Sequence, residues 1–310
     1  MSELPRPLRG VVPPMITPLE GPDRLSIEGL ERLIEHILGA GVNGLFILGT
    51  TGEAPALSYR TRREVVERTC RQVAGRVPVL VGITDTAFGE SVDMACHARA
   101  AGAQAVVASA PFYYPATQSE LLDYFENLST RLPLPTFLYN APTNTHHFFE
   151  PRTVQRIAQL PNIVGLKDSS ANMIYYHSVQ ELLSDRPAFT RLVGPEELMA
   201  EAVLMGGHGG MCGGANFFPQ LYVDLYRAAS ACDLEKVWVL QKRVMQISTT
   251  IYRVYKEGSA YLRGLKCAVS LKGICDDFMA EPFHSFSPEE RQQVQKHMLH
   301  LGLLTPGGQA

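Results

Sequence analysis

Eight short apolar runs recur along the chain, and segments with a helical pattern lie between most of them. Most of the runs are rich in valine, isoleucine and leucine, and they cover residues 10–17, 44–51, 77–84, 105–111, 135–142, 163–169, 191–196 and 209–215. After the first run, apolar residues recur at helical spacing behind Ser26, a residue suited to cap a helix. Continuous apolar strands that alternate with helices indicate a parallel sheet that is covered on both faces.

Eight such strands predict an α/β fold of the (β/α)8 TIM-barrel type. The alternative, an open doubly wound sheet, would carry a glycine-rich phosphate turn after its first strand. The first run ends instead in Pro-Pro-Met-Ile-Thr-Pro (13–18), which cannot form that turn. We expect residues 1–222 to form the barrel, as the catalytic domain, and residues 223–310 to form a C-terminal helical extension. Its last helix is expected to open at Ser287-Pro288, with Glu290 completing a capping box.

The charge and composition of the chain narrow the classes of partner. The net charge is -3 and no basic run is present, which argues against nucleic acid or an anionic membrane as a partner. The N-terminal residues lack the apolar core of a signal peptide, and no window of about 18 residues is continuously apolar, so we expect a cytoplasmic protein. The six cysteines show no metal-ligand spacing, and we expect no bound metal. A small molecule remains as the expected partner.

Lys167 is the strongest single candidate for catalysis. It ends an apolar run, at the strand end where a barrel places its catalytic groups, and it is the first lysine in the chain, with none following until Lys236. A lysine in such a place is poorly solvated, which favours the neutral amine. A neutral amine attacks ketones and forms a Schiff base. The alternative is a lysine that reaches solvent or pairs with Asp168.

Two other strand ends carry groups that would complement Lys167. Tyr139 ends the preceding strand, and its phenol can transfer protons between lysine and substrate. The turn GTTGE (49–53) follows an earlier strand; its backbone N–H groups can hold a carboxylate, and the Thr51 hydroxyl can join a proton relay. The alternatives are a half-buried tyrosine with a satisfied hydroxyl and an ordinary tight turn.

The glycine-rich segment GGHGGMCGG (206–214) permits two interpretations. A phosphate site is one, because barrels often keep a phosphate after their last two strands. The segment contains no lysine or arginine, so close packing around a short strand is the favoured interpretation. We expect His208 to be a turn residue rather than a metal ligand.

Several motifs at successive strand ends together resemble the dihydrodipicolinate synthase and N-acetylneuraminate lyase family. In chain order they are GTTGE, FYYP, YNAP, GLKDSS, GPEE and GGHGG. The resemblance spans nearly the whole chain, and YNxP followed about 28 residues later by a strand-end lysine is its most specific part. It implies a class I, Schiff-base (β/α)8 aldolase or lyase. The implied partners are a small-molecule 2-oxo acid such as pyruvate and an aldehyde, and no cofactor is implied beyond the covalent imine.

The resemblance also implies roles for individual residues. Lys167 would form the Schiff base, Tyr139 would be the general acid and base, and Thr50 and Thr51 would bind the pyruvate carboxylate. Tyr113 would complete the relay of a neighbouring subunit, which implies a homo-oligomer, a dimer or a tetramer.

The residues that would select the second substrate depart from each subgroup of that family. Members that take aspartate semialdehyde carry an arginine where this chain has Asn144, and an amide cannot replace its charge-assisted grip on a carboxylate. The sialic-acid lyases place an acidic pair where this chain has Glu196 and Glu197. For these two, helix N-terminal acids are the alternative. Ser169 and Met211 are further expected substrate contacts. Ser169 stands where those lyases have a threonine. The serine of those lyases in the last glycine run is replaced here by Gly213.

The sequence therefore predicts reversible aldol cleavage, or the related dehydration, of a 2-keto-3-deoxy sugar-acid-like substrate. One alternative is 4-hydroxy-tetrahydrodipicolinate synthase, which joins pyruvate and aspartate semialdehyde. The other is a non-catalytic relative that only binds 2-oxo acids.

Overall fold

A curled sheet of eight parallel strands lies at the centre of the computed structural model, which describes residues 4–256 and 258–305. The strands are β1 (Gly10–Val11), β4 (Leu45–Ile47), β5 (Val79–Gly82), β6 (Ala105–Ser109), β7 (Thr136–Asn140), β8 (Ile163–Asp168), β9 (Thr190–Val193) and β10 (Gly209–Gly210). They pair in the order β1-β10-β9-β8-β7-β6-β5-β4, so the order follows the chain and never reverses. This order confirms the predicted parallel α/β architecture and excludes a doubly wound sheet.

The two ends of the sheet meet at residues 13–15 and Phe46. Pro14 and Phe46 form an isolated parallel bridge. The Met15 N–H donates to the Phe46 carbonyl at 2.8 Å, and the Phe46 N–H donates to the Pro13 carbonyl at 2.9 Å. The chain after β1 is therefore hydrogen bonded to β4, and the sheet curls back on itself.

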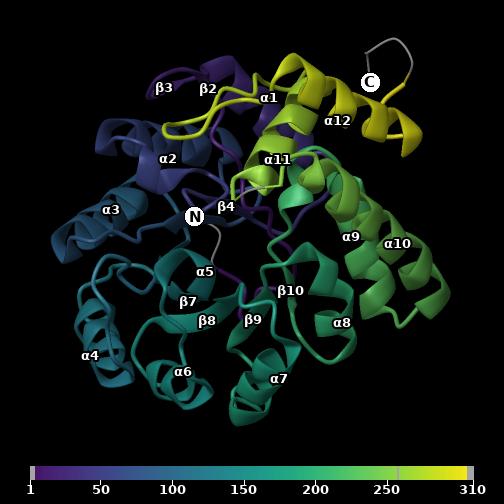
Figure 1. Ribbon diagram of the computed structural model, residues 1–310. Helices are drawn as coiled ribbons and strands as arrows, with labels where there is room; N and C mark the ends of the chain where they lie inside the picture. The colour runs from purple at the N-terminus through teal and green to yellow at the C-terminus, as the bar shows by residue number, and fades with distance from the viewer. Residues whose placement is uncertain (1–3, 257, 306–310) are drawn as a thin grey trace.

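Helices cover the outside of the curled sheet (Figure 1). Those that follow the strands in the first two thirds of the chain are α1 (Ile27–Leu38), α2 (Tyr59–Val73), α3 (Phe88–Ala101), α4 (Gln118–Ser129), α5 (Pro142–Thr145), α6 (Pro151–Ile157), α7 (Met173–Leu182) and α8 (Met199–Leu204). The predicted cap of the first helix is confirmed, because the Ser26 hydroxyl accepts a hydrogen bond from the Gly29 N–H.

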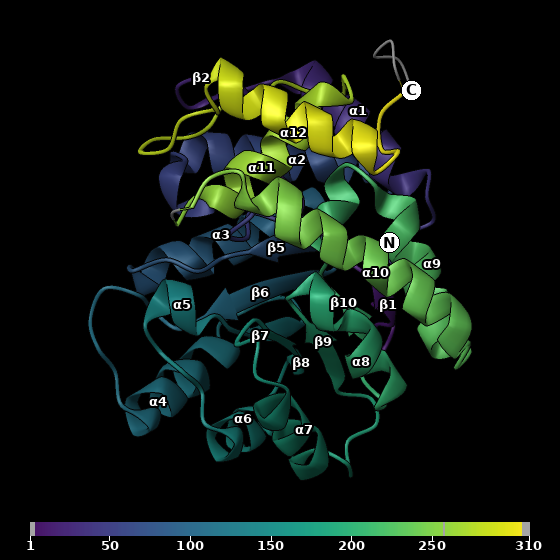
Figure 2. The same cartoon turned by 45° about the vertical axis from the view of Figure 1, so that its right-hand side comes forward.

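Only helices follow β10 in the described residues, and they lie along one side of the molecule (Figure 2). They are α9 (Pro219–Ser230), α10 (Leu234–Thr250), α11 (Ala260–Leu271) and α12 (Pro288–His300). The predicted start of the last helix is confirmed, since Ser287 and Glu290 form a capping box. The boundary predicted between residues 222 and 223 lies inside α9, and the division into two domains stays a prediction.

The interior of the curled sheet is a buried cluster that includes Tyr139. Successive side chains of a strand point to opposite faces, so one set from each strand fills the interior and the other packs under the helices. The interior set is Leu8, Val12, Phe46, Leu80, Ala105, Val107, Phe137, Tyr139, Ala141, Val164, Leu192 and Met211. Tyr139 and Met211 are thus part of one packed interior, at the end where the strands finish.

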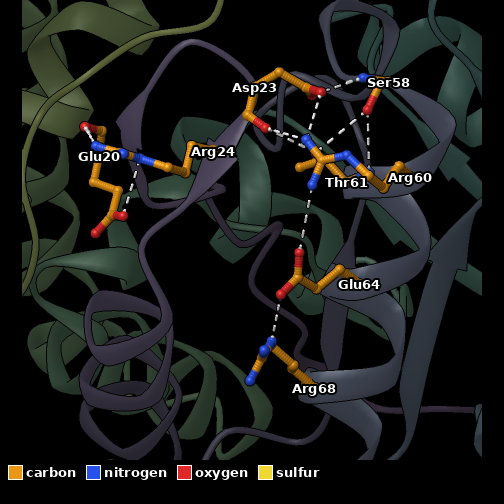
Figure 3. Close-up of polar contacts among 8 residues, drawn as sticks. All are labelled: Glu20, Asp23, Arg24, Ser58, Arg60, Thr61, Glu64 and Arg68. Atoms are coloured by element: carbon orange, nitrogen blue, oxygen red, sulfur yellow. Dashed lines mark hydrogen bonds and ion pairs between the residues drawn. The ribbon is translucent and has the colours of Figure 1, made fainter.

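A short antiparallel hairpin, which the apolar pattern did not predict, is fixed to the start of α2. It consists of β2 (Leu19–Gly21) and β3 (Arg24–Leu25). Figure 3 shows Asp23 at its turn: its carboxylate accepts from the Ser58 N–H at 2.9 Å and from Arg60 at 3.0 Å. These bonds hold the end of the loop that contains GTTGE.

A buried ion pair connects the same loop to the C-terminal helices. Glu53, the last residue of GTTGE, pairs with Lys266 of α11, and neither side chain is more than 2% exposed. The Glu53 carboxylate also accepts from the Ala280 N–H at 2.9 Å, and Lys266 donates to the Phe278 carbonyl at 2.7 Å. The loop therefore depends on a segment more than 200 residues away in the sequence.

Replacing Lys266 with methionine is expected to destabilise the fold strongly. The variant leaves the Glu53 carboxylate buried without its cation, which costs about 3–5 kcal/mol of unfolding free energy. The double variant Glu53→Gln with Lys266→Met removes both charges and should recover part of that loss. Urea denaturation of the three proteins measures both effects. A Lys266→Met variant within about 1 kcal/mol of the wild type would contradict this account.

Candidate active site

Lys167 and Tyr139 lie side by side at the ends of two neighbouring strands. They are register partners in β7 and β8, and both are buried, at 4% and 7% exposure. The Lys167 Nζ lies 4.2 Å from the centroid of the Tyr139 ring and 4.8 Å from that of Phe46. The predicted pairing of lysine and phenol at one end of the sheet is present in the structure.

The surroundings of Tyr139 favour loss of its proton. Burial alone would raise the pKa of Tyr139, but the Lys167 charge and hydrogen bonds from Ser169, Thr50 and Lys167 lower it below its ordinary value. The Ser169 hydroxyl donates to the phenol at 3.5 Å, and the Thr50 hydroxyl lies 3.4 Å from it. A phenol whose pKa is lowered in this way is suited to accept and return protons.

Asp168 does not pair with Lys167, although the two are adjacent in sequence. Its carboxylate accepts from the Asn140 amide at 2.8 Å and from the Ser170 hydroxyl at 2.9 Å. Neighbouring strand residues point to opposite faces, which separates the two side chains. Within residues 4–256 and 258–305 Lys167 has no ion-pair partner, so the alternative of a lysine paired with Asp168 is not what the structure contains.

The GTTGE turn brings Thr50, rather than Thr51, to the phenol. The sequence predicted Thr51 as the relay hydroxyl. In the structure the Thr50 hydroxyl lies against Tyr139, whereas the buried Thr51 side chain lies beside Tyr261 of α11. In the described part of the chain the backbone N–H groups of Thr50 and Thr51 make no hydrogen bond. Both can therefore donate to a carboxylate, as the sequence predicted.

A cavity of about 640 Å³ opens beside Tyr139. Thr50, Phe46 and Tyr139 lie on its buried side, and the predicted specificity residue Asn144, on α5, also lines it. The cavity is further lined by residues of the C-terminal segment, namely Gly258, Ser259, Tyr261, Leu262, Glu281, Pro282 and Phe283. No local sequence signal points to these residues, because they belong to no strand end and follow no recurrent motif.

The carboxylates of Glu196 and Glu197 are bound by groups of the C-terminal part of the chain, and this argues against their predicted role as substrate contacts. Both lie in a 3-10 helix (Glu196–Leu198) after β9. The Glu196 carboxylate accepts from the Gly214 N–H at 2.6 Å, the Tyr222 hydroxyl at 2.6 Å and the Tyr252 hydroxyl at 3.0 Å. The Glu197 carboxylate accepts from Ser248.

Two tyrosine hydroxyls account for glycines in the segment 206–214, because they occupy the space that a larger side chain would need. A Cβ atom on Gly213 would lie 1.6 Å from the Tyr261 hydroxyl oxygen, and one on Gly214 would lie 1.9 Å from that of Tyr222. His208 is buried, and its Nδ1 accepts from the Arg191 N–H at 2.9 Å. The glycines thus allow two phenols to reach the end of the sheet, which supports close packing rather than a phosphate site.

The stability of the fold is expected to depend on pH through Glu196. Burial and the nearby charge of Glu197 raise the pKa of Glu196 to about 7, against the hydrogen bonds that lower it. The folded state favours the protonated form of Glu196. The stabilisation that this proton gives to the folded state is complete below the ordinary glutamate pKa and is lost as the pH rises to about 7. A Glu196→Gln variant cannot titrate, so the wild type should lose about 3 kcal/mol more than the variant over that interval.

Urea denaturation of both proteins at several values from pH 4.5 to pH 8 measures the difference. Glu126→Gln, which changes an exposed glutamate on α4, is the matched control and should follow the wild type. Parallel curves for the wild type and Glu196→Gln would show that the network around Glu196 does not hold a proton.

The remaining predicted residues lie at different distances from Tyr139. Ser169 touches the phenol, as described, and packs against Gly194. Met211 is buried in the same interior cluster as Tyr139. Tyr113 is 75% exposed, in the loop after β6, where it packs edge to face on Tyr114 with ring centroids 5.0 Å apart. Its predicted place in a neighbouring subunit's relay stays a prediction.

Neither a metal-binding cluster nor a membrane-spanning helix occurs in the described residues. No group of three or more histidine, cysteine, aspartate or glutamate side chains is arranged to hold a metal ion in residues 4–256 and 258–305. No helix in this part of the chain is both long and apolar enough to cross a membrane.

Comparison with known proteins finds relatives that match nearly the whole chain. The family model described as the dihydrodipicolinate synthetase family matches residues 7–301. A protein of Escherichia coli named probable 2-dehydro-3-deoxy-D-pentonate aldolase YjhH is 30% identical, over 95% of this chain and 98% of its own. A 4-hydroxy-tetrahydrodipicolinate synthase of Hyphomonas neptunium is 31% identical, over 96% and 99%. The solved structure of dihydrodipicolinate synthase from Bacteroides thetaiotaomicron is 54% identical, with a TM-score of 0.93, over 96% of this chain and 100% of that one.

The fold and the site, with these matches, define the chain as an enzyme of the pyruvate-dependent lyase and aldolase class, as the sequence predicted. The chain belongs to the dihydrodipicolinate synthetase family.

Proposed function

We propose that this enzyme cleaves a 2-keto-3-deoxy sugar-acid-like substrate reversibly through an imine on Lys167, or dehydrates it through the same imine. The observation that carries the proposal is the buried Lys167 amine, which lies against the phenol of Tyr139. We also propose that the curled sheet is a closed (β/α)8 barrel, which the hydrogen bonds between residues 13–15 and Phe46 support.

Binding and imine formation use groups that already face one another. The carboxylate of the 2-oxo acid accepts hydrogen bonds from the N–H groups of Thr50 and Thr51. Lys167 gives a proton to the Tyr139 phenolate and attacks C2 as the free amine, and the ketone oxygen takes up a proton to give a carbinolamine. Loss of water gives the iminium ion, with Tyr139 moving the protons of both steps.

Bond cleavage then uses the same phenol as a base. The Tyr139 phenolate takes the proton of the C4 hydroxyl while the C3–C4 bond breaks. The electron pair of that bond passes to C3 and the iminium, giving an aldehyde and an enamine. Protonation of the enamine at C3 and addition of water at C2 release pyruvate and the free Lys167 amine. The lowered pKa of Tyr139 supports its part in this step.

Assembly and location complete the proposal. The exposed Tyr113 and Tyr114 pair supports a homo-oligomer, a dimer or tetramer in which Tyr113 joins the relay of the neighbouring subunit. We propose a cytoplasmic enzyme that needs no metal and no organic cofactor, since lysine, tyrosine and threonine supply every group named above.

The synthase reaction with aspartate semialdehyde is the second candidate. The name of the 54% identical structure favours it. Asn144 argues against it, because an amide cannot form the two charge-assisted hydrogen bonds that an arginine donates to a carboxylate. The two reactions share the imine on Lys167 and differ only in the aldehyde.

Borohydride reduction in the presence of pyruvate tests the proposed chemistry. Mass spectrometry of the peptides should find the reduced adduct on Lys167 and on no other lysine. Absence of an adduct would overturn the proposal and leave a relative that binds without catalysis. Rates of cleavage of 2-keto-3-deoxy acids, compared with condensation of pyruvate and aspartate semialdehyde, separate the two candidate reactions.

A further inference from the structure

The cavity beside Tyr139 has a buried side and a solvent side that come from different parts of the chain. Tyr139 and Phe46 are buried, whereas Asn144, Glu281, Pro282 and Phe283 are exposed. Lys167 itself is not a lining residue, but its amine lies 4.2 Å from the centroid of the Tyr139 ring, which is. A 2-oxo acid bound to Lys167 would therefore place its reacting carbons at the buried side. The aldehyde half of a longer substrate must therefore extend toward Asn144 and the C-terminal residues.

The charges along this cavity have one sign. Its described lining contains no lysine, arginine or histidine, and its charged members are Glu53 and Glu281. Glu53 is neutralised by Lys266 behind the wall. Glu281 is exposed and has no ion-pair partner in residues 4–256 and 258–305, so its negative charge faces whatever enters.

The uncharged polar groups of the lining suit hydroxyl groups. Besides Thr50 and Tyr139 of the catalytic end, they include Thr84, Ser109, Thr143, Asn144 and Ser259. Side-chain hydroxyls and the Asn144 amide can each donate and accept, and the Glu281 carboxylate accepts only. A polyhydroxylated chain matches such a mixture, because each of its hydroxyls both donates and accepts. A carboxylate at the same place would meet a like charge and no cation.

We infer that the solvent side of the cavity selects an uncharged, hydroxylated aldehyde half and excludes one that ends in a carboxylate, with Glu281 and Asn144 as the specificity-determining residues. The inference rests on the proposed imine chemistry and specifies the substrate class for it.

A matched pair of substrates tests the inference directly. 2-Keto-3-deoxygluconate and 2-keto-3-deoxyglucarate differ at C6, which is a primary alcohol in the first and a carboxylate in the second. The wild-type enzyme should cleave the first with a kcat/KM at least about tenfold higher, a difference of about 1.4 kcal/mol. Equal values, or a preference for the glucarate, would overturn the inference.

Three variants assign the preference to residues. Glu281→Gln keeps the shape and removes the charge, so the preference should fall, mainly through a lower KM for the glucarate. Asn144→Arg adds the cation that the cavity lacks and should reverse the preference. Glu289→Gln removes an exposed glutamate of α12 that does not line the cavity, and it should keep the wild-type ratio. Unchanged ratios in both Glu281→Gln and Asn144→Arg would show that neither residue selects the substrate.

Borohydride trapping with pyruvate accompanies each assay, so that failure of the imine chemistry can be told apart from failure of the inferred substrate class. An enzyme that forms no adduct lacks the proposed chemistry. An enzyme that forms the adduct and prefers the anionic or an amine-bearing chain retains that chemistry, and only the inferred substrate class is then wrong.

Discussion

A Lys167→Met variant is expected to form no adduct with pyruvate and borohydride and to lose about 10⁴-fold or more of its kcat. Methionine fills nearly the same volume in the buried site but has no amine, so the imine cannot form. Without the imine the electron pair of the C3–C4 bond has no acceptor. Mass spectrometry of the trapped protein and single-turnover rates measure the two losses separately.

Lys236→Met is the matched control for this experiment. Lys236 lies exposed on α10, and its loss should leave both trapping and kcat at wild-type values. Thermal denaturation of Lys167→Met should show a folded protein, because Lys167 has no ion-pair partner among the described residues that its removal would leave unpaired. A Lys167→Met variant that is still trapped by borohydride would move the chemistry to another lysine.

A Tyr139→Phe variant is expected to lose about 10²–10⁴-fold of its kcat, because proton transfer by a positioned side chain contributes that much. The adduct with pyruvate should still form, only more slowly, since Lys167 remains in place. In the wild type kcat should rise with pH below the ordinary tyrosine value of about 10, because the pKa of Tyr139 is lowered, and this rise should be absent in Tyr139→Phe. Stopped-flow trapping and a pH profile of kcat measure both effects.

Two threonine variants show whether the loss arises from the relay. Thr50→Val removes the hydroxyl beside the phenol and should lower kcat, whereas Thr51→Val removes a hydroxyl that contacts Tyr261 and should mainly raise the KM for pyruvate. A larger loss of kcat in Thr51→Val than in Thr50→Val would favour the relay that the sequence alone predicted.

The fold and the catalytic pair were predictable because their signals are local. Apolar runs and helical spacing locate the strands and helices, and the end of a parallel strand is where Lys167 and Tyr139 both stand. The choice between Thr50 and Thr51 was not predictable, because neighbouring residues in a turn point in different directions and sequence order does not say which faces the phenol. The same reason explains Glu196, whose acidity matched a sugar-binding residue while its side chain turned toward Tyr222 and Tyr252.

The C-terminal part of the site was the least predictable. Ser259, Tyr261 and Glu281 reach the cavity only because α11 and the segment before α12 fold back over the strand ends. Such contacts depend on the packing of helices far along the chain, and no periodicity or motif in one sequence records them. The extension, in which the sequence predicted no site residue, contributes to the cavity wall.

The contact between Gly213 and the Tyr261 hydroxyl leaves room for one of two groups, a side chain in the 3-10 helix (Gly213–Asn216) after β10 or a phenol on α11. In homologous sequences the two positions should therefore vary together. A relative that carries a serine at the position of Gly213 should carry a residue without the phenolic hydroxyl at that of Tyr261, and in such a relative Thr51 would be contacted by a different group. Paired substitutions across the family would thus record how the cavity has been reshaped during evolution, position by position.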